Sequence, residues 1–232
     1  MENDKLAELE SRIGISFLNK DNLLQALTHR SYLNENTEWH LDHNERLEFL
    51  GDAVLELVVT ENLYENYPDK PEGDMTNWRA ALVNAVMLAD ISKKFDLNEY
   101  VLLSRGEAKD VGRARQFILA NAIEALIGAI YIDQGYESSK KFILKFVMVE
   151  LDEILKNKAY KDYKSKFQEE SQDKVGITPT YEVIKEWGPD HAKTFKVGLF
   201  LEKELISEGE GLSKQEAQQE AAKSGLVKKG WD

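Results

Sequence analysis

The apolar side chains of this chain repeat with two different periods, and the change near residue 155 limits the fold more than any other feature. Over 44–64 they recur every three or four residues with no proline before Pro68, which predicts a long amphipathic helix. The same period over 115–133 predicts a second long helix, and Gly135 is a typical residue to end it. Shorter helices are expected near 21–28, 75–94 and 137–155, and the sequence leaves open whether the middle one is continuous or broken around 83–85. The first part of the chain is therefore predicted to be all-α.

Beyond Leu155 this helical period lapses, and the short polar segment that follows is typical of a linker. The side chains downstream alternate between apolar and polar, as in strands with one buried face. The expected elements are a helix at 163–173, strands at 180–187, 195–201 and 205–208, and a helix from Ser213. The predicted domains are an all-α domain at 1–155, a linker at 156–161 and a small α+β domain at 162–232 with the order helix, three strands, helix.

Charge and cysteine content narrow the kinds of site. The formal net charge of −12 argues against a surface that simply binds polyanions through Lys and Arg. Of the 42 acidic residues, 28 precede residue 160, as do 18 of the 30 basic residues, so the acidity is concentrated in the all-α part. The chain has no cysteine and only four histidines, so a metal would be held mainly by oxygen ligands.

No segment predicts membrane insertion or secretion. The sequence has no run of about 18 apolar residues, and its first residues, MENDKLAELE, lack the basic start and apolar stretch of a secretory signal. We therefore expect a cytoplasmic protein with no membrane partner.

Three acids lie on one face of the first long helix. Glu45, Glu48 and Asp52 are three and four residues apart, which places their side chains in a row. Hard divalent cations such as magnesium bind oxygen groups of this kind. Acidic helical faces are common, however, and spacing alone favours a solvated face.

The second long helix carries Asn121 and Glu124 within an otherwise apolar stretch. Polar groups among apolar neighbours need partners. The two side chains could satisfy each other or a backbone group. Alternatively, they complete an oxygen-lined metal site with Glu48 and Asp52 from the facing helix.

Residues 44–52, Asn-Glu-Arg-Leu-Glu-Phe-Leu-Gly-Asp, closely resemble the signature of the ribonuclease III family. Residues 28–32, 72–75 and 124–129 extend the resemblance. It implies a helical endonuclease domain that forms a homodimer and cuts both strands of duplex RNA with magnesium, for which manganese can substitute. A double-stranded-RNA-binding domain and a role in RNA processing are implied as well.

The resemblance also assigns roles to residues. Glu48, Asp52 and Glu124 match the family's metal-binding carboxylates, and Glu45 matches the acid that opens the signature. The implied catalytic set is Glu45, Asp52, Asn121 and Glu124, and the implied metal set is Glu48, Asp52, Asn121 and Glu124. Glu72 matches a further acid near the cleavage valley, but it could equally belong to a solvated turn. His29 and Ser31 also match, and we interpret them as local hydrogen-bonding residues that fix a helix end.

Two metal ions about 3.5 to 4 Å apart would activate the attacking water and stabilise the leaving 3′-oxygen. The resemblance implies products with 5′-phosphate and 3′-hydroxyl ends. Position 121 departs from the family pattern, because Leu119-Ala120-Asn121 stands where that pattern has Leu-Ala-Asp. An amide offers an oxygen but carries no charge and cannot accept a proton as a carboxylate does. An introduced substitution that traps uncut substrate, a natural loss of activity and a tolerated change remain open. The fit of the neighbouring residues to an active enzyme favours the first.

Residues 162–230 resemble a double-stranded-RNA-binding domain, most clearly at 188–193 and 213–217. Duplex RNA is recognised through 2′-hydroxyls and phosphates. The residues implied in RNA binding are Ser165, Gln168 and Gln172 on one face of the first helix, His191 in a loop, and Ser213 and Lys214 at the start of the last helix. A helix start and a cation together favour phosphate, although a simple cap explains Ser213 equally well. Gln215 stands where the family often has a second lysine, which predicts weaker, magnesium-assisted binding.

Two other functions are compatible with these features. A non-catalytic protein that holds RNA duplexes without cutting them is the main alternative, and Asn121 distinguishes it from an active nuclease. A metal-binding structural protein with no RNA partner would require both long motifs to be coincidental.

Overall fold

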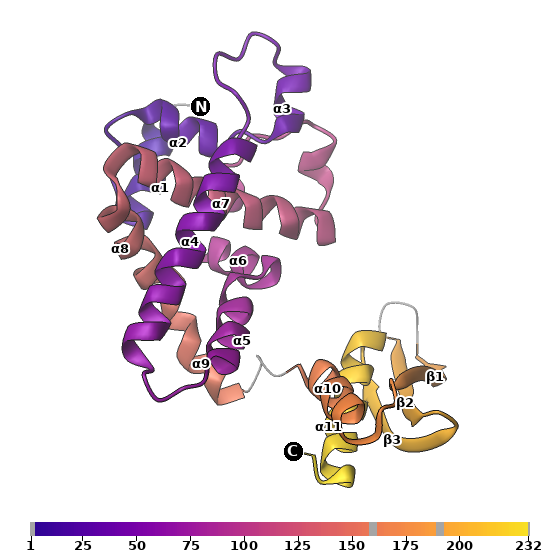
Figure 1. The fold of residues 1–232 in the computed structure, drawn as a ribbon. Coiled ribbons are helices and arrows are strands. Elements are labelled where there is room, and N and C mark those ends of the chain that lie inside the picture. The colour runs from indigo at the N-terminus through magenta and orange to yellow at the C-terminus, as the bar shows by residue number, and fades with distance from the viewer. Residues whose placement is uncertain (1–2, 158–161, 189–192, 232) are drawn as a thin grey trace. The chain divides into compact units, whose positions relative to one another are not determined.

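The computed structural model describes residues 3–157, 162–188 and 193–231, and Figure 1 shows its ribbon. The chain divides into two compact units, residues 1–160 and 161–232. The first is helical, and the second has the order helix, three strands, helix. The predicted fold class is therefore confirmed.

The first unit is built from α1 (Asn3–Ile13), α2 (Lys20–Ala26), α3 (Arg30–Glu35), α4 (Glu45–Asn66), α5 (Glu72–Val83), α6 (Ala85–Ser92), α7 (Arg113–Gln134), α8 (Tyr136–Phe146) and α9 (Leu151–Asn157). Short 3₁₀ turns lie at Lys93–Phe95, Leu97–Glu99, Glu107–Lys109 and Met148–Glu150.

The 75–94 segment is broken at Asn84, which settles the question that the sequence left open. Its backbone is extended, and its side chain accepts a hydrogen bond from the Met87 N–H at 3.0 Å, which starts α6. The single helix expected over 137–155 is wrong, because a 3₁₀ turn at Met148–Glu150 separates α8 from α9. Helix α9 also extends to Asn157, two residues into the segment expected to be a linker, and 158–161 lie outside the described residues.

Helices α4 and α7 cross at the centre of the first unit (Figure 1). They touch through their backbones at two glycines. A Cβ atom added to Gly51 would lie 1.7 Å from the Glu124 carbonyl oxygen, and one added to Gly128 would lie 2.2 Å from the Leu47 carbonyl oxygen. Because no side chain fits between them, the glycines fix where one helix crosses the other.

Helix α7 supplies much of the core. It is long and apolar enough by composition to cross a membrane, but more than half of its most apolar part is buried inside the protein. Core helices of globular proteins share this composition, and here the α7 segment Ala125–Ile130 is fully buried among its neighbours. We therefore describe α7 as the core helix of this unit.

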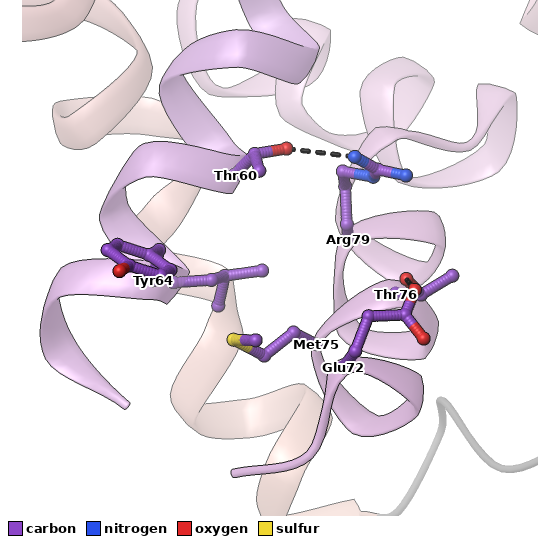
Figure 2. Close-up of a pocket in the computed structure, with 7 residues that line it drawn as sticks. Thr60, Tyr64, Glu72, Met75, Thr76 and Arg79 are labelled. Carbon is purple, nitrogen blue, oxygen red and sulfur yellow. Dashed lines mark hydrogen bonds between the residues drawn. The ribbon is translucent and has the colours of Figure 1, made fainter. Parts of the chain in front are cut away.

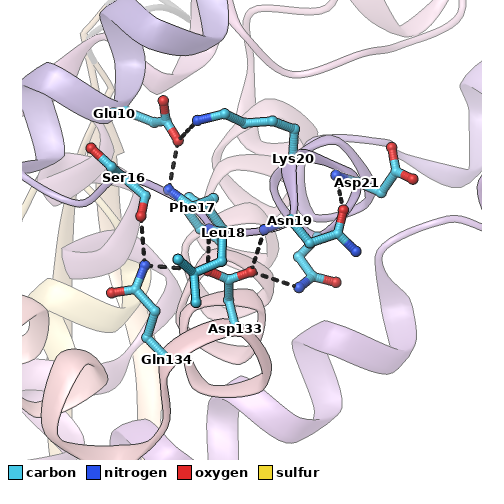
Figure 3. Close-up of polar contacts among 10 residues, drawn as sticks. Glu10, Ser16, Phe17, Leu18, Asn19, Lys20, Asp21, Asp133 and Gln134 are labelled. Atoms are coloured by element: carbon cyan, nitrogen blue, oxygen red, sulfur yellow. Dashed lines mark hydrogen bonds and ion pairs between the residues drawn. The ribbon is translucent and has the colours of Figure 1, made fainter.

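Two carboxylates hold the segment between α1 and α2 against the rest of the unit (Figure 3). Glu10, which is buried, accepts a hydrogen bond from the Phe17 N–H at 2.6 Å and forms an ion pair with Lys20. Asp133, near the end of α7, accepts from the Leu18 and Asn19 N–H groups at 2.7 and 2.9 Å. These contacts tie the N-terminal helices to the far end of the helix that carries Asn121.

The second unit contains α10 (Tyr163–Val175), β1 (Thr180–Trp187), β2 (Thr194–Leu201), β3 (Glu204–Gly211) and α11 (Lys214–Lys229). The sheet is antiparallel in the order β1-β2-β3. Both helices pack on one face of the sheet around Phe167, Leu199 and Leu226. The third strand is longer than the expected 205–208.

Candidate active site and RNA-binding surface

The α4–α7 crossing brings the predicted acidic residues of both helices together. Asn121 hydrogen-bonds to Glu48, and Glu124 lies within electrostatic range of Glu48 and Asp52. Asp52 is exposed, whereas Glu48, Asn121 and Glu124 are half-buried. The two helices thus bring four of the predicted residues into one cluster.

The pKa values record unbalanced negative charge. Burial, followed by the Asp52 and Glu48 carboxylates, raises the pKa of Glu124 to about 7. Burial and the Glu45 charge raise the pKa of Glu48, while the hydrogen bond from Asn121 partly opposes that rise. Among the residues described, no Lys or Arg forms an ion pair with any carboxylate of this cluster. The cluster lacks a protein cation.

Glu45 lies at the edge of the cluster. Its carboxylate is 3.5 Å from the Arg30 guanidinium and 3.8 Å from a ring nitrogen of His43. It acts on Glu48 through its charge. The predicted catalytic set is therefore divided into a central group and a peripheral acid.

The donor chemistry of the cluster fits a divalent cation. Three carboxylates and an amide offer oxygen, the ligand type that magnesium and manganese prefer. Within the described ranges, however, no three His, Asp or Glu side chains are grouped closely enough to form a metal site by themselves. Without a cation, the carboxylates of Glu48, Asp52 and Glu124 repel one another. The fourth oxygen donor of the cluster, Asn121, is an uncharged amide.

Glu72 lies apart from this cluster. It lines a pocket of about 190 Å³ between α4 and α5, with Thr60, Tyr64 and Arg79 among its neighbours (Figure 2). Its carboxylate accepts a hydrogen bond from the Thr76 hydroxyl at 2.8 Å. Thr60 is two turns beyond Asp52, about 12 Å along α4. The structure therefore does not join Glu72 to the α4–α7 carboxylates.

His29 and Ser31 form a helix start. The His29 ring accepts from the Ser31 N–H at 3.3 Å and caps α3, and the Ser31 hydroxyl accepts from the Ser104 N–H at 3.1 Å. The interpretation of these two residues as local hydrogen-bonding residues is confirmed.

The predicted RNA-binding residues of α10 lie on an exposed surface of the second unit. Ser165, Gln168 and Gln172 are exposed at i, i+3 and i+7, so they share one face. The Ser165 hydroxyl donates to Asp162 at 2.7 Å, which leaves its lone pairs free to accept from a partner. Asp162 itself caps α10 by accepting from the Ser165 N–H.

The start of α11 has a cap similar to a capping box, in which the glutamate bonds the residue before the N-cap. The Ser213 hydroxyl accepts from the Glu216 N–H at 3.1 Å, and Glu216 reaches back to the Leu212 N–H at 2.7 Å. Lys214 is exposed, with its ammonium 5.8 Å from the Phe195 ring centroid. His191 lies outside the described residues.

Sequence reasoning missed two surface features of the first unit. Four basic residues lie around the third 3₁₀ turn and in the first turn of α7, namely Arg105, Lys109, Arg113 and Arg115. In addition, Phe49, Leu57 and Tyr64 expose 82%, 56% and 74% of their surface along one face of α4. A local excess of cations in an acidic domain, and apolar residues on the polar side of an amphipathic pattern, were the signals that could have found them.

Comparison with known proteins identifies the family. Residues 19–151 match the family described as Ribonuclease-III-like, and residues 163–228 match the double-stranded RNA binding motif. The chain belongs to the ribonuclease III family. Ribonuclease 3 of Desulforamulus reducens is 43% identical over 222 residues, which cover 96% of this chain and 90% of that protein. Ribonuclease 3 of Natranaerobius thermophilus is 45% identical over 217 residues, covering 94% of this chain and 93% of that protein.

A solved ribonuclease III structure matches the first unit. The nuclease domain from Campylobacter jejuni, described for flexibility in a region involved in dimer formation, is 39% identical with a TM-score of 0.56. The match covers 61% of this chain and 95% of that one. The chain is therefore a ribonuclease III family endoribonuclease with a double-stranded-RNA-binding domain.

Proposed function

We propose that this ribonuclease III binds duplex RNA and hydrolyses both strands with magnesium or manganese, leaving 5′-phosphate and 3′-hydroxyl ends, and that Asn121 impairs the cleavage. The observation that carries the proposal is the hydrogen bond between Asn121 and Glu48 inside the carboxylate cluster. It supports a role for position 121 in the reaction centre, because the amide contacts a predicted metal ligand where α4 and α7 cross.

Glu48, Asp52 and Glu124 would hold the divalent ions. When bound, the ions lower the pKa of the attacking water and stabilise the charge on the leaving oxygen. Because its pKa is about 7, Glu124 is present in protonated and ionised forms near neutral pH and must lose its proton to act as a ligand. Glu45, at the edge, adds negative charge that favours cation binding.

Asn121 takes part of the role of a cation in this arrangement. The bond lowers the pKa of Glu48, so the amide donates its N–H to the carboxylate. A carboxylate at position 121 would instead repel Glu48 and would need a metal ion between the two. The amide thus stabilises the ionised Glu48 carboxylate. Because it carries no negative charge itself, it attracts divalent ions less than an aspartate at 121 would.

We propose that two copies of the chain assemble through α4. Phe49, Leu57 and Tyr64 are eight and seven residues apart, so they lie on one helical face. Exposed apolar patches of this kind mark interaction surfaces. A second copy supplies the same apolar stripe and a second cleavage site, which suits cutting both strands.

RNA binding is assigned to the second unit and to the basic segment before α7. Ser165, Gln168 and Gln172 would contact 2′-hydroxyls in one minor groove of the duplex. His191 would contact the next minor groove along it. Lys214 would contact phosphate at the start of α11. Arg105 and Lys109 would contact phosphates near the cleavage site.

The proposal is tested by single-turnover cleavage of a labelled RNA duplex over a range of magnesium concentrations, comparing the chain with its Asn121→Asp variant. We expect slow cleavage by the chain, fast magnesium-dependent cleavage by the variant, and equal duplex affinity. Equal rates would show that the amide is a tolerated ligand. If neither protein cuts but both bind, the non-catalytic RNA-binding function is the correct one.

A further inference from the structure

A hollow of about 540 Å³ lies between the first turns of α10 and α11. Its lining includes Lys164, Ser165 and Gln168 from α10 and Lys214, Gln215 and Gln218 from α11. It therefore joins the predicted minor-groove residues to the predicted phosphate contact. Lys164 is the one lining cation to which the sequence assigned no role.

The carboxylate in this hollow is already occupied. Asp162 accepts hydrogen bonds from the Ser165 N–H at 3.1 Å, the Ser165 hydroxyl at 2.7 Å and the Gln219 amide at 2.8 Å. Burial tends to raise the pKa of Asp162, but these neutral donors outweigh it and lower that pKa. Its charge is stabilised without the Lys164 ammonium.

The Lys164 ammonium is held by neutral groups. Its ammonium donates to the Gln218 side-chain oxygen at 2.9 Å and lies 5.2 Å from the Tyr181 ring centroid, while its backbone N–H donates to Gln219 at 3.2 Å. An ammonium has three donors, so at least one stays available. Because the side chain is half-buried and fixed, binding an anion costs it little conformational entropy.

Several lysines of this unit, but not all, are neutralised by carboxylates. Five of them, Lys174, Lys193, Lys196, Lys223 and Lys229, lie within 4 Å of a carboxylate oxygen. In the described part of the unit, neither Lys164 nor Lys214 has an ion pair of this kind. The two cations of the hollow are therefore left with charge for a ligand.

We propose that Lys164, oriented by Gln218, forms a second phosphate-binding position beside Lys214, so that one RNA strand passes over the hollow with its backbone between the two lysines. The inference rests on the proposed RNA binding. Lys164 would replace the cation that this chain lacks at Gln215. Phosphate contacts release counterions, so each one increases the salt dependence of binding.

The test is a salt titration of duplex RNA binding by the full-length chain and by Lys164→Ala, Lys164→Arg and Lys214→Ala variants. Lys166→Ala is the matched control, because Lys166 is exposed in the same turn of α10 but does not line the hollow. The slope of log affinity against log salt is negative. We expect Lys164→Ala to make it less steep by about one, as Lys214→Ala does. Lys164→Arg should retain the slope and Lys166→Ala should leave it unchanged.

The outcomes separate the two levels of the proposal. If the unmodified chain binds no duplex RNA, the proposed function fails. If it binds and Lys214→Ala makes the slope less steep while Lys164→Ala does not, the assignment of Lys164 is overturned and the RNA-binding function stands. A loss of affinity by Lys164→Ala with an unchanged slope also overturns it, because a purely structural role for Lys164 would produce that result.

Discussion

The two units differ in whether their charged side chains find partners within the protein. In the first unit, Glu48, Asp52 and Glu124 lie at the α4–α7 crossing without a protein cation, and burial together with the charges of Asp52 and Glu48 raises the pKa of Glu124 to about 7. In the second, neutral donors satisfy Asp162, and Gln218 orients the Lys164 ammonium while leaving it with a donor to spare. The difference teaches that the first surface is complete only with added positive charge, whereas the second is preorganised before its ligand arrives.

The largest expected effect tests the incomplete cluster. Asn121→Asp should increase magnesium-dependent cleavage by roughly a thousandfold, because stabilisation by metal ions is worth several kcal/mol and each 1.36 kcal/mol is about tenfold in rate. Glu124→Gln added to this variant should abolish the gain. A gain that survives Glu124→Gln would mean that the cluster does not act as a unit.

The next effect concerns the crossing that creates the cluster. Gly128→Ala should lower the free energy of unfolding by about 3 kcal/mol, because its Cβ would lie 2.2 Å from a backbone oxygen. Gly73→Ala is the control, since a Cβ there meets nothing within 4 Å. Urea denaturation measures both. A Gly128→Ala protein as stable as Gly73→Ala would contradict the backbone contact.

A smaller effect follows from Glu124. Its folded-state pKa lies above the value near 4.5 of an exposed glutamate, so the protonated form is favoured in the folded protein. The stability from this group is therefore present below pH 4.5 and lost as pH rises to about 7. Allowing for solvent screening, we expect a loss on the order of 1 kcal/mol without divalent ions.

The measurement is thermal unfolding of the chain and of Glu124→Gln in chelator between pH 4.5 and 8. The variant should lose less stability over this range, and added magnesium should reduce the difference by stabilising the ionised carboxylate. Parallel profiles with and without the substitution would show that Glu124 is not strained by its neighbours.

The smallest effect tests the preorganised surface. Asp162→Ala should cost about 1 kcal/mol of stability through loss of the α10 cap, whereas Asp162→Asn should cost less because its side-chain oxygen still accepts. Duplex affinity should fall with Asp162→Ala as Ser165 and Gln219 lose their partner. Unchanged affinity would indicate that the network does not position the RNA-binding side chains.

Much of the fold was predictable because periodicity depends on local sequence. The lengths of α4 and α7 and the cap at Ser213 follow from patterns within one element, whereas the sequence left the break at Asn84 open. The break between α8 and α9 was not predictable, since apolar residues continue through it and only tertiary packing interrupts the helix.

The sequence was enough to predict which residues belong to the site. It was not enough to predict which of them contact one another. Spacing shows that Glu48 and Asp52 share a helical face. It does not reveal how the facing helix crosses, and hence that the Asn121 amide meets Glu48. The position of Glu45 against Arg30 and the separation of Glu72 also depend on contacts distant in sequence.

The contact between Gly51 and Gly128 has an evolutionary consequence. Backbone atoms at the two glycines set the register of the two helices, so the register does not depend on the side chain at 121. Asparagine and aspartate codons differ by one base. Under the proposed function, a single A-to-G transition in a gene for this chain would therefore convert a protein that holds duplexes into one that cuts them.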